Sequence, residues 1–148
     1  MSKEDKNDVF YVCSLIEYIA RVTKNRICDI VKILGKNELK RQLELAEVNH
    51  TLSFEQVSDE IIEEFDIKEG DYDFIGKCIY KVPSYLSIGK NYQRLIEDVC
   101  NETNDLVDDF YNVMTSFITN EMSNYNSSFF YSSREYLKLC YKSGRILE

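Results

Sequence analysis

The chain has little of what builds folds rich in strands and tight turns, and it has no tryptophan at all. Its 148 residues include only five glycines and one proline. Hairpin turns draw heavily on both residue types. Their scarcity argues against a sandwich or barrel and favours helices joined by short connections. The aromatic residues are eleven tyrosines and eight phenylalanines, and tyrosine suits both half-buried helix faces and protein interfaces.

Histidine is almost absent as well, which limits the chemistry available. His50 is the only histidine, so no histidine cluster can hold a metal, and zinc sites need four nitrogen or sulfur ligands at close spacing. The sequence contains no glycine-rich phosphate loop and no nucleophile elbow. His50 beside Thr51 could act as a general base, but no nucleophile or orienting acid accompanies it, and both residues also suit a turn. We therefore expect no enzyme, no metal and no cofactor.

The cysteines are few, odd in number and far apart. They are Cys13, Cys28, Cys78, Cys100 and Cys140, with no C-x-x-C pair among them. This pattern predicts buried free thiols in a reducing compartment. The N-terminal residues are polar, unlike a secretion signal, and no apolar run reaches the roughly 18 residues of a membrane span. We expect a cytoplasmic protein with no membrane association.

Charge is distributed very unevenly along the chain, whose net charge is −8. Between Glu44 and Asp73 there are eleven Asp or Glu residues and a single base, Lys68. Just before this stretch, residues 21–41 carry seven bases and two acids. Such a split predicts a surface that binds a macromolecule. The overall negative charge favours a basic partner and makes nucleic acid an unlikely one.

Apolar residues recur at three- and four-residue spacing through most of the chain, which predicts an all-α protein. The expected helices cover residues 8–24, 26–34, 37–46, 53–65, 88–101, 105–124 and 132–144. Gly35 is suited to close the second of these, and Ser53 with Gln56 and Ser132 with Glu135 have the spacing of capping boxes. Residues 66–73 are predicted to form a linker. Residues 74–82, before Pro83, fit either a short helix or an extended segment.

The predicted architecture is a multi-helix bundle of about six to seven helices in two packed modules. The N-terminal module covers residues 1–68 and ends in the acidic helix, while the C-terminal module covers residues 73–148. The alternative of one continuous domain remains open. So does the formation of a homo-oligomer.

Two surfaces are candidates for a protein partner. Glu60, Glu63 and Glu64 lie on the outward face of the 53–65 helix, late in the helix, where acids oppose its macrodipole. They serve either as a docking surface for a basic partner or as an ordinary solvated face. Phe129, Phe130 and Tyr131 follow a polar stretch and would form a sticky patch if exposed. Otherwise they fill the space between the last two helices.

The basic segment supports a different hypothesis, DNA binding. Two short helices separated by Gly35 within residues 26–45 have the spacing of a helix-turn-helix. Lys36, Lys40 and Arg41 lie near the second helix, where they could meet phosphates. Short helices joined by a glycine are also common in any bundle. The alternative function is thus a DNA-binding transcriptional regulator.

Part of the sequence resembles a known group of proteins. The matching residues lie within positions 5–66 and are Val9-Phe10-Tyr11-Val12, Ile16-Glu17-Tyr18, Asp29 to Gly35, His50-Thr51, Val57, Asp59, Glu60 and Ile61. They resemble small helical bacterial proteins of unknown function that are often encoded beside ADP-ribosyltransferase-like toxins. Residues 36–49 are longer and more polar than that pattern, and residues 73–148 fall outside it and look like tails of uncharacterised bacterial proteins.

The resemblance implies an antitoxin-like or accessory role. Such a protein would bind and neutralise a toxin partner, here an ADP-ribosyltransferase-like one. An acidic helical chain without catalytic residues is consistent with a binding inhibitor. The leading hypothesis from the sequence is therefore a non-catalytic protein-binding module.

Overall fold

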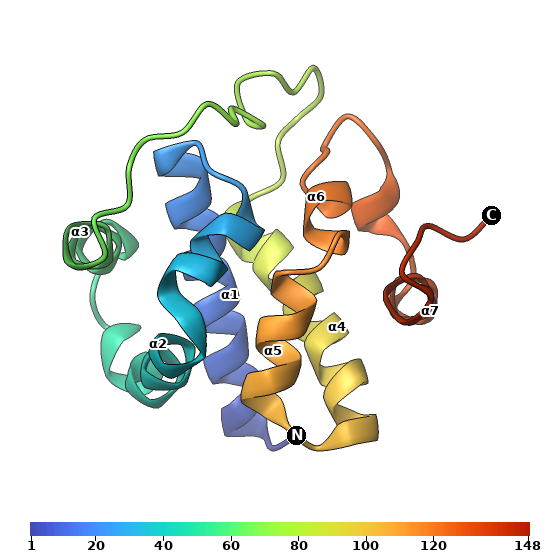
Figure 1. Cartoon of the computed structure of the whole chain (residues 1–148), viewed down its shortest axis with the longest axis horizontal. Coiled ribbons are helices and arrows are strands. Elements are labelled where there is room, and N and C mark those ends of the chain that lie inside the picture. Colours follow the sequence, from blue (N-terminus) through green and yellow to red (C-terminus); the bar gives the residue numbers. More distant parts are fainter.

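Helices make up 68% of the chain, and no strand is present. The computed structural model describes all residues from 1 to 148. Its elements are α1 (Lys3–Thr23), α2 (Ile27–Asn49), α3 (Phe54–Glu64), α4 (Tyr85–Thr103), α5 (Leu106–Met114), α6 (Ile118–Met122), the 3₁₀ helix η1 (Phe129–Tyr131) and α7 (Arg134–Ser143). They pack as a helical bundle with α7 at one side (Figure 1). The predicted all-α fold class is confirmed.

Helix α1 is the centre of the bundle. Residues Val9 to Glu17 form an almost continuous buried run, and the helix packs against α2, α3 and α4. It begins at Lys3 rather than at the predicted Asp8, because the Ser2 hydroxyl caps it by accepting a 3.0 Å hydrogen bond from the Asp5 amide. Apolar periodicity cannot reveal this first polar turn, which depends on the cap alone.

Helix α2 contains a break at Gly35, where two separate helices were predicted. The backbone there has φ 77° and ψ 171°, which is not helical, and the helix continues on the other side as far as Asn49. Glycine adopts positive φ without the steric cost that a Cβ atom imposes. The two segments therefore meet at a kink instead of being separated by a turn, and the second extends beyond its predicted end at Ala46.

The predicted helix over residues 105–124 is wrong, because two helices occupy that stretch. The Thr115 hydroxyl donates a 2.7 Å hydrogen bond to the Tyr111 carbonyl, and the Ser116 hydroxyl donates one of 2.7 Å to the Val113 carbonyl. Side-chain hydroxyls that bond nearby carbonyls compete with helix continuation. The chain breaks between Met114 and Ile118 as a result.

The two predicted capping boxes have different outcomes. Ser53 caps α3, since its hydroxyl accepts a 3.1 Å hydrogen bond from the Gln56 amide. At α7 the cap is Ser133, whose hydroxyl accepts from the Tyr136 amide at 3.3 Å, so the prediction of Ser132 is wrong by one residue. The Ser132 amide instead donates to the Phe129 carbonyl and ends η1.

Residues 66–84 form an irregular segment between α3 and α4, and residues 74–82 are neither helix nor strand. The segment is tied to both halves of the chain. The Gly70 amide donates to the Thr23 carbonyl at 2.8 Å, and the Ile79 amide donates to the Asn126 side chain at 2.9 Å. A Cβ atom on Gly70 would lie 2.5 Å from the Lys24 carbonyl oxygen, so this close approach requires glycine.

The modules predicted for residues 1–68 and 73–148 share one hydrophobic core. A single cluster of 32 buried residues draws on both. Helix α4 packs closely along α1, and at Gly89 an added Cβ atom would lie 3.0 Å from the Ser14 Cα. Burial of this continuous apolar surface is the main stabilising contribution to the fold.

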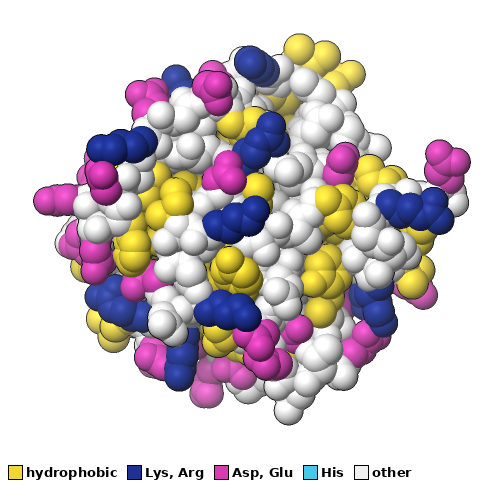
Figure 2. Space-filling view, in the orientation of Figure 1, with side chains coloured by type: hydrophobic (Ala, Val, Ile, Leu, Met, Phe, Trp, Pro, Cys, Tyr) yellow, Lys and Arg dark blue, Asp and Glu magenta, His cyan; other side chains and the backbone are white.

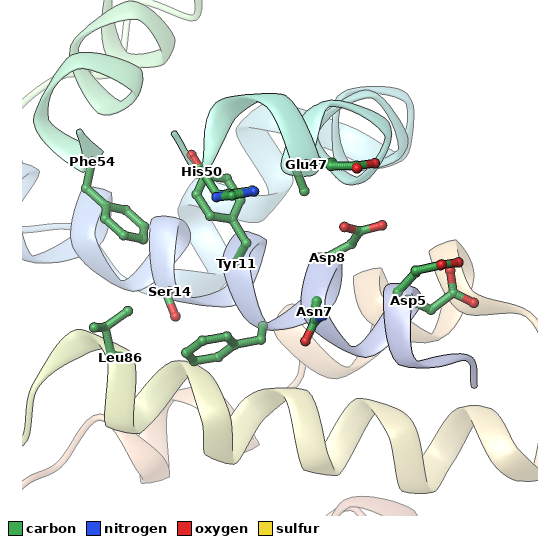
Figure 3. Close-up of a pocket in the computed structure, with 12 residues that line it drawn as sticks. Asp5, Asn7, Asp8, Tyr11, Ser14, Glu47, His50, Phe54 and Leu86 are labelled. Atoms are coloured by element: carbon green, nitrogen blue, oxygen red, sulfur yellow. The ribbon is translucent and has the colours of Figure 1, made fainter. Parts of the chain in front are cut away.

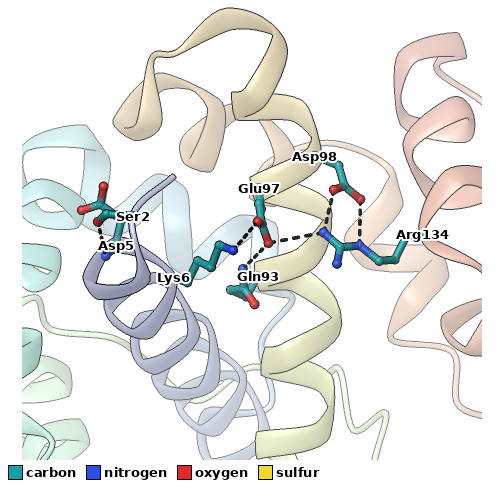
Figure 4. A network of polar contacts seen from close by, with 7 residues as sticks. All are labelled: Ser2, Asp5, Lys6, Gln93, Glu97, Asp98 and Arg134. Atoms are coloured by element: carbon teal, nitrogen blue, oxygen red, sulfur yellow. Dashed lines mark hydrogen bonds and ion pairs between the residues drawn. The ribbon is translucent and has the colours of Figure 1, made fainter.

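Charged side chains fasten α1, α4 and α7 together at the surface (Figure 4). The Lys6 ammonium lies 3.0 Å from Glu97, and the Arg134 guanidinium lies 3.3 Å from Glu97 and 2.6 Å from Asp98. The pKa of Glu97 is lowered, because hydrogen bonds from Lys6 and Gln93 and the charges of Lys6 and Arg134 outweigh its partial burial. Networks of this kind contribute more than isolated surface pairs.

A second polar cluster is centred on a fully buried acid. Glu17 has no exposed surface, and its Oε2 atom accepts hydrogen bonds from Arg21 Nε at 2.7 Å and from the Tyr125 hydroxyl at 2.8 Å. Arg21 also donates a 2.8 Å bond to the Pro83 carbonyl. Burial raises the pKa of Glu17, although Arg21 and Tyr125 oppose the shift. Partners for both charges make this burial tolerable.

All five cysteines are free. Cys13, Cys28, Cys100 and Cys140 are buried, as predicted, whereas Cys78 is only half-buried because it lies in the irregular segment. Burial raises the pKa of the Cys13 thiol well above its ordinary value. Such thiols behave as small apolar side chains.

Candidate binding site

A pocket of about 750 Å³ lies along one face of α1. In Figure 3, α1 runs along its floor, the end of α2 and the start of α3 border one side, and the start of α4 borders the other. Its twelve lining residues are Glu4, Asp5, Asn7, Asp8, Phe10, Tyr11, Ser14, Ala46, Glu47, His50, Phe54 and Leu86. The volume falls in the range of small-ligand sites.

One end of the pocket is strongly acidic. Glu4 and Asp5 come from the first turn of α1, Asp8 comes from the next turn, and Glu47 comes from the last turn of α2. No Lys or Arg lines the pocket, and none of these four carboxylates takes part in a salt bridge. Burial, together with the negative charges of Asp5, Glu47 and Glu4, raises the pKa of Asp8. The four acids therefore repel one another, and a bound cation would relieve that repulsion.

The other end of the pocket is aromatic. The Tyr11 ring stacks on Phe54 with 5.4 Å between ring centroids, and Phe54 in turn contacts Tyr85 edge to face at 5.0 Å. Phe10 and Leu86 add further apolar surface. An apolar body bearing a positive charge would complement both ends of the pocket.

Two hydroxyl groups in the pocket lining lack hydrogen-bond partners. Tyr11 is only 8% exposed and Ser14 is fully buried, yet neither hydroxyl is within hydrogen-bond reach of a protein partner. Tyr11 extends from α1 to beside His50 (Figure 3). Buried polar groups in native proteins almost always have a partner. The Ser14 hydroxyl faces Gly89 across the contact between α1 and α4, so the Tyr11 hydroxyl is the one left for a ligand.

The pocket is not suited to a metal ion. No group of three or more His, Cys, Asp or Glu side chains in the chain is arranged to hold one. His50, the one histidine, has its side chain at the pocket rim (Figure 3). Its neighbour Thr51 donates a 2.8 Å hydrogen bond to the Val48 carbonyl, which orders the turn before α3.

The predicted acidic face of α3 points into solvent. Glu60, Glu63 and Glu64 are exposed, and the last turn of the helix contains no base. Only Glu64 has a basic neighbour, Arg41, at 3.9 Å. The structure thus places the three side chains together on an accessible surface outside the pocket lining.

The predicted aromatic patch is mostly internal. Phe130 is 3% exposed and contacts the Tyr125 ring edge to face at 5.2 Å. Phe129 is half-buried against Tyr136. Only Tyr131, at 75% exposure, is accessible. Phe130 as a partner-binding residue is therefore a wrong prediction, because the 3₁₀ turn of η1 directs it into the core.

Two of the three predicted DNA-binding residues form salt bridges with acids. Lys36 forms a 2.9 Å salt bridge with Asp108, and Arg41 forms one of 2.9 Å with the buried Glu38. Hydrogen bonding to Asp108 raises the pKa of Lys36. Of the three candidate bases only Lys40 has no acidic partner, and the kink at Gly35 replaces the expected turn.

One feature of the sequence corresponds to the pocket. Glu4, Asp5 and Asp8 are three and four residues apart, and Tyr11 follows at the same spacing, which places them on one helix face. Apolar periodicity predicts a first helix that begins only at Asp8, so Glu4 and Asp5 fall outside it. The partner side chains from α2 and α3 become neighbours only in the folded chain.

Comparison with protein-family models, with curated proteins and with solved structures found no match for this chain. The resemblance of residues 5–66 to toxin-associated proteins stays a prediction. None of the helices combines the length and the apolarity that a bilayer span requires.

Proposed function

We propose that this chain is a non-catalytic binding protein that captures a basic protein partner, and that the partner is a toxin which it neutralises. The observation that carries the proposal is the exposed acidic face of α3. Glu60 and Glu63 have no basic neighbour, and the helix ends without the bases that would complement its macrodipole. These acids contribute nothing to the helix itself, whereas a basic surface would pair with them.

Charge at such a surface mainly changes the rate at which the two proteins associate. Complementary charges accelerate association, and added salt weakens the effect. The net charge of −8 would reinforce this attraction for a basic protein. The resemblance of residues 5–66 suggests an ADP-ribosyltransferase-like toxin as the specific partner.

Charge reversal tests the proposal. Glu60→Lys, Glu63→Lys and Glu64→Lys together should leave the helical circular dichroism spectrum unchanged, because exposed substitutions usually change stability by about 0.5 kcal/mol or less each. The wild-type chain, immobilised, should retain a basic protein from lysate of its natural host. With that protein purified, the triple variant should associate at least tenfold more slowly at low salt and protect cells less from its toxicity.

A matched control has the same change in charge at scattered positions. Asp71, Glu135 and Glu148 are exposed acids outside α3 that form no salt bridge. Reversing these three should leave association within about twofold, because only the focused acidic face steers the partner. Equal rates for the wild type and the α3 variant would reject the acidic face as the docking surface.

A further inference from the structure

We infer that the pocket on α1 binds an alkylammonium group carried on an aliphatic chain. The inference is independent of the acidic face of α3, which lies outside the pocket lining. Two sources could supply this chemistry, a free polyamine or the side chain of a lysine in a partner protein. In the second case the pocket would hold a lysine side chain of the proposed partner and so anchor that protein.

The charge of the site selects a cation. Four carboxylates line the pocket without a single Lys or Arg, and the pKa of Asp8 is raised by burial and by its acidic neighbours. By contrast, buried Glu17 pairs with Arg21, and Glu97 pairs with Lys6. The four carboxylates of the pocket thus lie close together with no basic side chain to balance their charge.

The shape and the hydrogen-bonding groups select an ammonium rather than a metal ion. A metal needs several ligands converging on one point, and no such cluster exists. An ammonium has three donors that can reach separate acceptors. The unpartnered Tyr11 hydroxyl, together with the carboxylates of Asp8 and Glu47, provides acceptors of this kind.

The aromatic end accounts for the aliphatic chain. Tyr11 and Phe54 offer aromatic surface to the methylene groups and to the cation, and Phe10 and Leu86 add to the apolar wall. A comparable arrangement already exists beside the pocket, where the Lys90 ammonium lies 5.6 Å from the centroid of the Phe10 ring. A small inorganic cation would leave this apolar surface unused.

The test is a titration of the full chain at low salt, followed by two-dimensional amide NMR. The probes are cadaverine, spermidine, and a short peptide containing one lysine. Pentanol serves as the uncharged control for the amines, and norleucine in place of lysine serves for the peptide. We expect saturable shifts confined to the lining residues of α1, the end of α2, the start of α3 and the start of α4. Saturation by the amines alone identifies a free ligand as the source, and saturation by the lysine peptide identifies a protein.

Variants assign the binding to the pocket. Asp8→Asn and Glu47→Gln, which preserve size, should each weaken binding of the saturating probe at least tenfold, and Tyr11→Phe should weaken it severalfold. Glu44→Gln is the matched control, an exposed acid of α2 outside the pocket lining, and should leave affinity within twofold. The inference is overturned if no probe saturates at millimolar concentration, if pentanol binds as tightly as cadaverine, or if Asp8→Asn binds like the wild type.

Discussion

The hydroxyl of Tyr125 donates a 2.8 Å hydrogen bond to Glu17 Oε2, which joins two residues 108 positions apart in the sequence. The bond lies in the interior, where Glu17 also pairs with Arg21. It connects α1 to the loop that follows α6, so the last quarter of the chain depends on the first helix. The bond ties distant parts of the fold together.

Removal of the Tyr125 hydroxyl should destabilise the protein. Tyr125→Phe keeps the ring, which packs against Phe130 and Phe74, but leaves Glu17 with one donor fewer. Loss of a buried hydrogen bond to a charged group costs about 1–3 kcal/mol. Urea unfolding followed by circular dichroism measures this difference. Tyr131→Phe, at a residue 75% exposed, should be neutral, and equal effects of the two variants would contradict the assignment.

Glu17 should also make stability depend on pH in a predictable direction. Its pKa in the folded protein is raised above the ordinary 4.5, so the folded state holds this proton more tightly than the unfolded chain does. The contribution of Glu17 to stability is therefore greatest below pH 4.5 and declines as pH rises through the folded pKa. Other acids, such as Glu97, have lowered pKa values and act in the opposite direction.

A comparison with Glu17→Gln isolates this effect from the other acids. We expect the unfolding free energy of the wild type, minus that of the variant, to become smaller between pH 4 and pH 7. Urea unfolding at closely spaced pH values provides both curves. A difference that grows with pH would show that Arg21 and Tyr125 outweigh burial and lower the pKa instead.

The contact between Gly89 and Ser14 should not tolerate a methyl group. Alanine favours a helix over glycine by about 1 kcal/mol, but a Cβ atom at position 89 would lie 3.0 Å from the Ser14 Cα and 2.0 Å from its hydroxyl oxygen. The helices would have to separate, and overpacking of this kind costs about 1–3 kcal/mol. We expect Gly89→Ala to lower the thermal midpoint. Asn101→Ala, at an exposed position of α4, should leave it unchanged or raise it slightly.

Duplex DNA should not form a specific complex with this protein. Lys36 and Arg41 are paired with Asp108 and Glu38, and the net charge of −8 repels phosphates. A gel shift on the upstream region of its own operon, near physiological salt, tests this expectation. Nanomolar, sequence-specific binding that is lost in the variant Lys36→Ala, Lys40→Ala, Arg41→Ala would establish the regulator hypothesis instead.

The sequence was sufficient for the helical class and for most of the core. The apolar spacing of Val12, Ile16 and Ile19 predicted a buried stripe, and these residues are at most 1% exposed. Helix ends were harder to predict, because a single hydroxyl decides them, as at Ser2 and at Ser116. Periodicity reports which face is buried and says little about where a helix stops.

The candidate sites also differ in whether the sequence alone could predict them. The exposure of Glu60 and Glu63 followed from helical spacing, since both lie outside the stripe formed by the buried Val57, Ser58 and Ile61. The burial of Phe130 depends on its packing against Tyr125, which no local pattern contains. The pocket on α1 requires the end of α2 and the start of α3 in place, so only the tertiary structure could reveal it.

The irregular segment 66–84 has a consequence for any attempt to divide the chain. It connects α3 to α4, but the interface between α1 and α4 already holds the two sides together without it. Lys77 and Lys81 are exposed within this segment and offer trypsin a place to cut. A chain cut there would therefore migrate as two fragments on a denaturing gel but elute as one particle from a size-exclusion column under native conditions. Neither fragment expressed alone would bury the apolar surface that it contributes to the core.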